Sequence, residues 1–197
     1  MEADVIVIGG GHAGCEAAAA AARIGVRTIL VTHKFETIGQ MSCNPAIGGV
    51  GKSHLVKEID AADGIMARCA DRAAIHLKVL NSSKGPAVRA TRAQADRELY
   101  KKSVQKELMS LANLEIVEGE VTDLGIRNYQ IGSVAVGEGK ILKAQKVILT
   151  TGTFLNGKLF TGMDNNEGGR AGDNSSKKLA EKLRNIDFSV GRLKTGT

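Results

Sequence analysis

The sequence predicts an α/β fold built on a parallel sheet. Residues 4–8 are an almost wholly apolar run rich in β-branched side chains, which is typical of a strand buried on both faces. A glycine-rich turn follows this run directly, and the alanine-rich segment after it, which ends at Arg23, favours a helix. Residues 27–31 form a second apolar run, so residues 1–32 are predicted to form a β-α-β unit.

The composition agrees with this fold class. Aromatic residues make up only 3% of the 197 residues and Trp is absent, so the core must be built mainly from aliphatic side chains. The 24 glycines and two prolines indicate tight turns rather than a flexible linker. No apolar run approaches the roughly 20 residues that span a bilayer, and the acidic N-terminus does not resemble a secretory signal. We therefore expect a cytoplasmic protein without membrane contact.

The rest of the chain is predicted to complete a single domain over residues 1–197. Glycine-rich irregular segments are expected at residues 36–53 and 153–173. Hydrophobic periodicity predicts further helices at residues 54–70, 93–111 and 176–184. It also predicts a third strand at residues 114–118, short strands around Val121, residues 131–136 and Ile141, and a final buried strand at residues 146–152.

The strongest motif is Gly9-x-Gly11-x-x-Gly14, which lies between the first predicted strand and the first predicted helix. In such a motif, Gly9 permits a tight turn, Gly11 lets a pyrophosphate approach the backbone, and Gly14 allows close packing of helix and strand. The free N–H groups at the start of the helix then face the phosphate charge. Dinucleotide binding is predicted for Gly9, Gly10, Gly11, His12, Ala13 and Gly14, and the alternative is a tight turn without a ligand.

The later organisation favours FAD over NAD. The acidic residue that normally holds the adenosine ribose is expected after the second strand, but Thr32 and His33 occupy that place. A hydroxyl or an imidazole can still form hydrogen bonds with a ribose. A helical insert, a third strand, a β-meander and a strand ending in glycine are typical of flavoproteins with two dinucleotide-binding domains. Residues 118–121 lie where such proteins bring the backbone to the adenine, so the predicted fold is a Rossmann-like FAD-binding domain of this type.

The glycine-rich loop contains a candidate reactive thiol, Cys43. Residues 46–53 resemble a phosphate-binding P-loop, but the first glycine of that motif is Ala46 and no apolar strand precedes it, so a cradle closing over the flavin is the favoured interpretation. Cys43 is either a catalytic thiolate or a structural residue. Cys15 and Cys69 fall in helical patterns and are expected to pack as small hydrophobic residues. The cysteine and histidine spacings predict no metal site and no disulfide framework.

Basic side chains gather in the middle of the chain. Residues 84–97 contain three Arg and one Lys around a predicted turn into a helix, and Lys101, Lys102 and Lys106 continue the charge. The whole chain carries a formal net charge of +6. Such a stripe either follows a nucleic-acid backbone or is a solvated helix face, and the sequence leaves both interpretations open.

Five segments together resemble the N-terminal part of the MnmG (GidA) family, namely residues 9–14, 38–49, 83–97, 168–173 and 192–197. This resemblance implies a flavoenzyme that modifies tRNA together with an MnmE-type GTPase. The family adds an aminomethyl or carboxymethylaminomethyl group to C5 of the wobble uridine. It uses FAD, NADH and a one-carbon unit from methylenetetrahydrofolate, and a homodimer is expected for the complete enzyme.

The resemblance also implies roles for individual residues. The turn at residues 9–14 would hold the FAD pyrophosphate, Val121 would lie on the adenine side, and Ser176 would lie near the flavin. Cys43 is a candidate nucleophile, because a thiolate that adds to C6 of uracil makes C5 able to attack an electrophilic carbon.

The chain is expected to be incomplete. Family members are much longer, and no apolar strand precedes Gly172 and Asp173, so the last strand of the cofactor domain is expected to be missing. The 197 residues alone are expected to be inactive and to bind FAD weakly, and sub-micromolar retention of FAD would contradict this. Two alternatives stay open: an FAD-dependent oxidoreductase of small molecules and a non-catalytic flavin-binding module.

Overall fold

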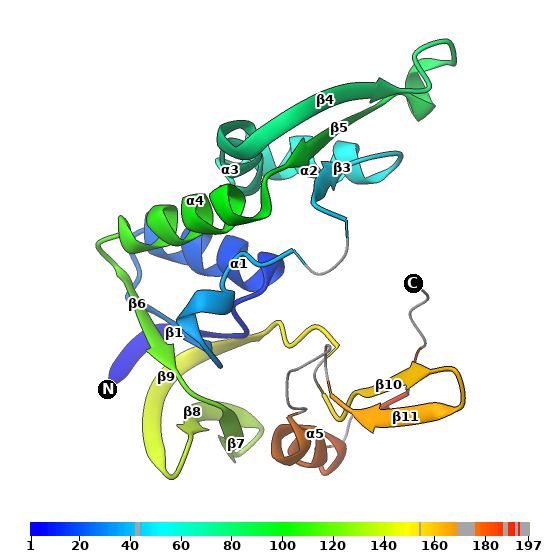
Figure 1. Ribbon diagram of the computed structural model, residues 1–197. Coiled ribbons are helices and arrows are strands. Elements are labelled where there is room, and N and C mark those ends of the chain that lie inside the picture. The colour runs from blue at the N-terminus through cyan, green and yellow to red at the C-terminus, as the bar shows by residue number, and fades with distance from the viewer. Residues whose placement is uncertain (42–43, 154, 169–175, 187–188, 192, 194–197) are drawn as a thin grey trace.

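The computed structural model describes residues 1–41, 44–153, 155–168, 176–186, 189–191 and 193. Its largest sheet has six strands in the order β6-β2-β1-β9-β8-β7 (Figure 1). Its parallel part contains β1 (Glu2–Ile8), β2 (Thr28–Thr32), β6 (Leu114–Glu118) and the second half of β9 (Lys140–Leu149). The antiparallel meander contains β7 (Val121–Arg127), β8 (Gln130–Val136) and the first half of β9. The mixed α/β fold with a parallel sheet is confirmed.

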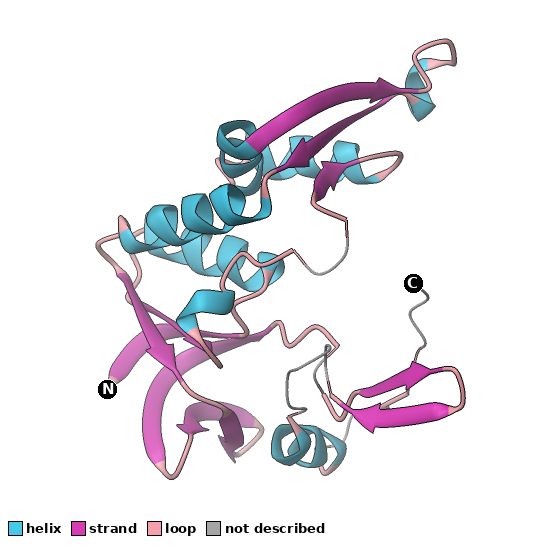
Figure 2. Cartoon of the chain, viewed as in Figure 1, coloured by secondary structure: helices cyan, strands magenta, loops and turns pink. Residues whose placement is uncertain are grey.

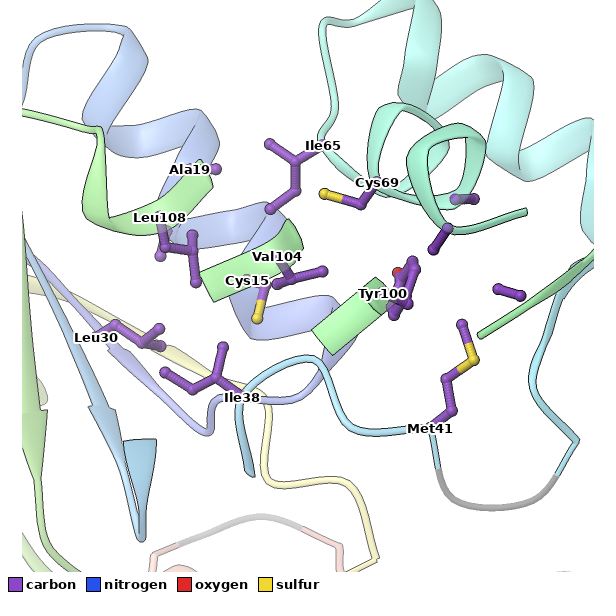
Figure 3. Close-up of a cluster of buried hydrophobic side chains, with 14 of the residues drawn as sticks. Cys15, Ala19, Leu30, Ile38, Met41, Ile65, Cys69, Tyr100, Val104 and Leu108 are labelled. Carbon is purple, nitrogen blue, oxygen red and sulfur yellow. The ribbon is translucent and has the colours of Figure 1, made fainter. Parts of the chain in front are cut away.

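The two faces of the parallel strands β1 and β2 are buried against different elements. Val7 and Leu30 point to the face that is covered by helices α1 (His12–Arg23) and α4 (Arg97–Met109). Figure 3 shows part of this core, with Tyr100, Val104 and Leu108 of α4 above Leu30. Neighbouring strand residues such as Ile6 and Ile29 belong to a second cluster formed with the meander and α5 (Lys177–Arg184). Burial on both faces explains why β1 and β2 lack polar alternation.

A second unit is inserted between β2 and β6 (Figure 2). The short helix η1 (Phe35–Thr37) leads into it. The unit contains an antiparallel sheet of β3 (Ala46–Gly48), β5 (Ala90–Ala95) and β4 (Ala74–Leu80), with helices α2 (Lys52–Ala61) and α3 (Met66–Ala73) and the short helix η2 (Pro86–Val88). The Glu16 carboxylate of α1 accepts the backbone N–H groups of Ile65 (3.1 Å) and Met66 (2.6 Å), so it caps α3 and ties the unit to the first helix. A hairpin of β10 (Lys158–Thr161) and β11 (Asp164–Glu167) precedes α5.

Two predicted helices have different bounds. The helix predicted at residues 54–70 is divided into α2 and α3, because Asp63 between them adopts a positive φ of 62° that a helix does not allow. The helix predicted at residues 93–111 begins only at Arg97, because Asp96 is its N-cap and accepts the N–H of Leu99 at 2.9 Å. The residues before Asp96 belong to β5.

Some strand predictions were also wrong. The strands predicted around Ile141 and at residues 146–152 are one strand, β9, which pairs first with β8 and then with β1. Its end is not buried, since Ile148 and Leu149 are 38% and 39% exposed. Strands β3, β4, β10 and β11 were not predicted. The β-α-β unit, the strand at residues 114–118, the meander and the helix near residues 176–184 are confirmed.

The described cysteines Cys15 and Cys69 are buried, with 2% and 0% of their surface exposed, as expected of small hydrophobic residues (Figure 3). Burial raises the pKa of the Cys15 thiol to about 12 and also raises the pKa of Cys69. Neither residue is therefore a thiolate at neutral pH. Within the described ranges, the structure has no helix with both the length and the apolar character needed to cross a bilayer.

Candidate nucleotide site

A cavity of about 240 Å³ lies at the carboxyl ends of the parallel strands β1, β2 and β9. Open α/β sheets bind their ligands at this edge. The loops after the three strands supply most of its wall, and the start of β7 and helix α5 supply the rest. The lining residues used below are Gly9, Gly10 and Gly11 after β1, Thr32, His33 and Lys34 at the end of β2, Thr150 after β9, and Val121 and Ser176.

Gly9 and Gly14 are required by the packing of the turn itself. Gly9 has a φ of +107°, and a Cβ atom there would overlap the carbonyl oxygen of Thr150. A Cβ atom at Gly14 would overlap the carbonyl oxygen of Gly9 and lie 2.7 Å from Oγ1 of Thr150. The Thr150 hydroxyl lies 2.9 Å from the carbonyl oxygen of Ile8 and 3.1 Å from that of Gly9, so it closes the turn against β9. The geometry agrees with the turn and packing roles that the motif predicts for these two glycines.

Gly11 is not required by the packing of the protein. It lines the cavity, has an ordinary φ of −74°, and a Cβ atom there would meet nothing within 4 Å. Gly11 is also the N-cap residue of α1, where no side chain caps the helix. The backbone N–H groups of the first helical turn therefore face a space that can hold an anion. A pyrophosphate requires open space beside backbone N–H groups, and the start of α1 at Gly11 provides both.

Replacing Gly11 with alanine should weaken FAD binding by at least about tenfold without lowering stability, because the methyl group would fill space that only the ligand uses. Titration of the variant with FAD, followed by flavin fluorescence, measures the first effect, and thermal unfolding measures the second. Gly85→Ala is the control, because Gly85 also has an ordinary φ of −62° and open space around it but does not line the cavity. Unchanged FAD affinity in the Gly11 variant would contradict the role of this wall.

Val121 and Ser176 lie at the same cavity as the glycine turn, although they are far from it in the sequence. Both are buried, with 3% and 4% of their surface exposed. Ser176 precedes α5, and its hydroxyl lies 3.3 Å from Nε2 of His33 at the end of β2. The end of β2 is the adenosine side of a Rossmann-type site. Ser176 therefore lies beside this end and not at the flavin, where the family resemblance places it.

His12 and Ala13 do not line the cavity. The His12 ring packs against Tyr100 instead, with 5.6 Å between the ring centroids, and burial lowers its pKa. His12 is therefore neutral at physiological pH, and its side chain belongs to the contact between α1 and α4. These two residues reach a ligand only through the backbone at the start of α1.

The glycine-rich segment at residues 46–53 was predicted to form a cradle over the flavin, and the structure does not show one in its described part. Residues 46–48 form strand β3 and pair with β5, and none of the described residues 44–53 lines the cavity. The cradle interpretation therefore has no support from the described part of this loop. A P-loop is not supported either, because the strand before the loop at residues 49–51 is a three-residue strand of a small antiparallel sheet and not a buried parallel strand. Cys43 lies outside the described residues.

The basic segment at residues 84–97 was predicted to form a turn into a helix, and this prediction was wrong. It forms η2 and β5, so most of it belongs to the hairpin of β4 and β5. Arg92 of β5 lies directly opposite Lys78 of β4, which concentrates positive charge on the hairpin. Lys101 pairs with Glu98, and its charge is therefore partly neutralised.

Sequence reasoning missed several residues of the cavity wall, including Lys34 and Thr150. The available signal was topological, because parallel strands end at one edge and the residues after each of them share that edge.

Comparison with known proteins gives a consistent result. The family model described as glucose inhibited division protein A matches residues 4–197. Two crystal forms of GidA from Aquifex aeolicus are 46% identical to this chain, with TM-scores of 0.91 and 0.92, and the matches cover 95% and 96% of this chain. Each match covers 31% of the Aquifex chain, so the present chain spans about a third of its length. The GidA-related protein from Thermus thermophilus shares the fold at 22% identity and a TM-score of 0.69, with 94% and 69% of the two chains covered.

Proposed function

The chain belongs to the GidA family, and from this premise we propose that it supplies the FAD-binding domain of an enzyme that modifies tRNA. The observation that carries the proposal is the meeting of Gly9–Gly11, Val121 and Ser176 around one cavity at the carboxyl edge of the parallel sheet. The complete enzyme would act in the cytoplasm as a homodimer with an MnmE-type GTPase. It would add an aminomethyl or carboxymethylaminomethyl group to C5 of the wobble uridine.

The residues of the cavity fit FAD. The backbone of Gly9, Gly10 and Gly11 and the first turn of α1 would bind the pyrophosphate, while Val121 would contact the adenine. Bound FAD supplies two-electron redox chemistry, with NADH as the reductant and methylenetetrahydrofolate as the source of the one-carbon unit. The chain itself would bind and orient the cofactor. We propose that residues 1–197 form one domain for this purpose.

Two other functions use the same cavity. A small-molecule oxidoreductase would resemble the probable FAD-dependent monooxygenase pqsL from Pseudomonas aeruginosa, which shares the fold at 17% identity and a TM-score of 0.54. A non-catalytic flavin-binding module is the other alternative. The family match includes the cationic hairpin of β4 and β5, which has no role in either alternative, and this supports a tRNA substrate.

Binding of tRNA at a series of salt concentrations tests the proposal. We expect the chain to bind FAD and the complete enzyme to bind tRNA, with an affinity that falls steeply as salt rises because phosphate contacts release counterions. Replacing both Lys78 and Arg92 with glutamine should reduce the salt dependence, while replacing Lys140 and Lys143 of β9 is a control with the same change in charge. If the complete enzyme binds FAD but not tRNA, the oxidoreductase alternative is favoured. If it binds both but modifies no uridine, the chain belongs to a non-catalytic binding protein.

A further inference from the structure

The η1 segment, residues 34–41, lies between the cavity and helix α4. On the side of the helix, Ile38 and Met41 are buried in the core that they share with α4 (Figure 3). The side chains of the segment that line the cavity are those of Lys34, Thr37 and Gln40. The position of η1 therefore decides where part of the cavity wall is placed.

The helix η1 (Phe35–Thr37) is too short to be stable by itself. A helix of one turn fixes several backbone angles for very few hydrogen bonds, so it needs contacts from elsewhere. Its first N–H groups and its last carbonyl groups have no partners within the helix, and the side chain of its N-cap residue, Lys34, does not cap it. Other elements must supply an acceptor at one end of η1 and a donor at the other.

Two side chains from distant elements supply these partners. At the start of η1, the Glu118 carboxylate at the end of β6 accepts the backbone N–H of Phe35. At the other end, the Gln105 amide of α4 reaches three carbonyl oxygens. Its Nε2 atom lies 3.3 Å from that of Phe35, 3.5 Å from that of Glu36 and 3.3 Å from that of Ile38. The amide nitrogen has two N–H groups, which the three carbonyl oxygens share.

The backbone of the η1 segment lies directly against α4 beside Gln105. Gly39 has a φ of +74°, and a Cβ atom there would lie only 2.9 Å from Cβ of Val104, the neighbour of Gln105 in the helix. Gln105 is half-buried at this contact and does not line the cavity. It can therefore affect a ligand only through the segment that it holds.

We propose that Gln105 is a positioning residue, whose amide fixes the η1 segment against α4 and thereby holds Lys34, Thr37 and Gln40 ready for the dinucleotide. The inference rests on the proposed FAD site. A wall that is ordered before the ligand arrives loses less conformational entropy on binding. Without the amide, the three carbonyl oxygens lose their donor, and part of the binding energy is used to order η1. Gln105 thus raises the affinity without touching the ligand.

Gln105→Met tests the inference, because methionine is also unbranched and of similar length but has no N–H groups. Titration with FAD, followed by flavin fluorescence, should show an affinity about fivefold lower, the range of one net hydrogen bond. In the ligand-free protein, the backbone N–H groups of the η1 segment should exchange faster with deuterium by at least about the same factor. Gln105→Lys should restore both values, because an ammonium group can again donate to these carbonyl oxygens.

Asn113→Leu and Asn113→Lys are the matched controls. Nδ2 of Asn113 also donates to a backbone carbonyl oxygen, that of Ala22 at 3.2 Å, but neither residue lines the cavity. These variants remove the same kind of bond and make the same change in charge, and both should keep the FAD affinity within about twofold of the unmodified protein. Thermal unfolding shows that each variant is folded.

The outcomes at Gln105 and at the cofactor site are distinguishable. The inference is overturned, and the proposed function stands, if Gln105→Met binds FAD as tightly as Asn113→Leu does. It is also overturned if Gln105→Lys binds FAD no better than Gln105→Met. If the unmodified protein binds no FAD even at millimolar concentration, the proposed function fails, and the inference fails with it.

Discussion

Replacing Cys43 with alanine in the complete enzyme is expected to lower the rate of wobble-uridine modification by at least about a thousandfold, while FAD binding stays unchanged. The C5 atom of uracil is a weak nucleophile. A thiolate that bonds to C6 pushes the electron pair of the double bond toward C5, which can then attack the electrophilic one-carbon unit. Loss of a proton from C5 and release of the thiolate afterwards restore the ring. We propose Cys43 for this role.

The structure narrows the choice of thiol within this chain. Cys15 and Cys69 are both buried, and burial raises the pKa of each thiol, so neither can supply a thiolate to a polynucleotide. Cys43 is the remaining cysteine of the sequence. Cys69→Ala is therefore a suitable control, since it should lower stability slightly and leave the rate per folded molecule unchanged. A Cys43 variant that modifies uridine at the normal rate would remove this residue from the mechanism, whatever its effect on tRNA binding.

Much of the fold could be predicted because its strongest signals are local. The apolar run of β1, the glycine turn and the alanine-rich α1 each predict their own structure from adjacent residues. The second half of β5, residues 93–95, was assigned to a helix because the hydrophobic periodicity extends over residues 93–111. It is a strand only because β3 and β4 pair with it on either side, which places Ala93 between Ile47 and Leu77. Pairing of this kind is not visible in a single segment.

The candidate site also combines features that adjacent residues predict with contacts between distant segments. The glycine turn could be recognised from spacing, whereas Val121 and Ser176 were assigned from the family resemblance. No local pattern links Ser176 to His33, which is 143 residues away in the sequence. They meet because α5 packs on the meander and its first turn reaches the end of β2. The absence of an acid at Thr32 and His33 was visible in the sequence, whereas the contact between His33 and Ser176 became apparent only in the structure.

Gly14→Ala is expected to destabilise the protein by about 3 kcal/mol or more and to abolish FAD binding as a consequence. The added Cβ atom would overlap the carbonyl oxygen of Gly9 and approach the Thr150 hydroxyl, so α1 would have to move away from β1 and β9. Flexible side chains cannot relieve this overlap, because its main partner is a backbone atom. The displaced helix would also draw Cys15 and Ala18 out of the core that they share with Leu30.

Urea unfolding of Gly14→Ala measures the loss, and Gly11→Ala is its matched control in the same turn. The two alanines add the same atom three positions apart, yet one meets the backbone and the other meets open space. The Gly14 variant should therefore lose both stability and FAD binding, whereas the Gly11 variant should lose FAD binding alone. Equal stability of the two variants would show that helix and strand are not in the close contact described here. Normal FAD affinity in both variants would show that the cofactor does not bind at this turn.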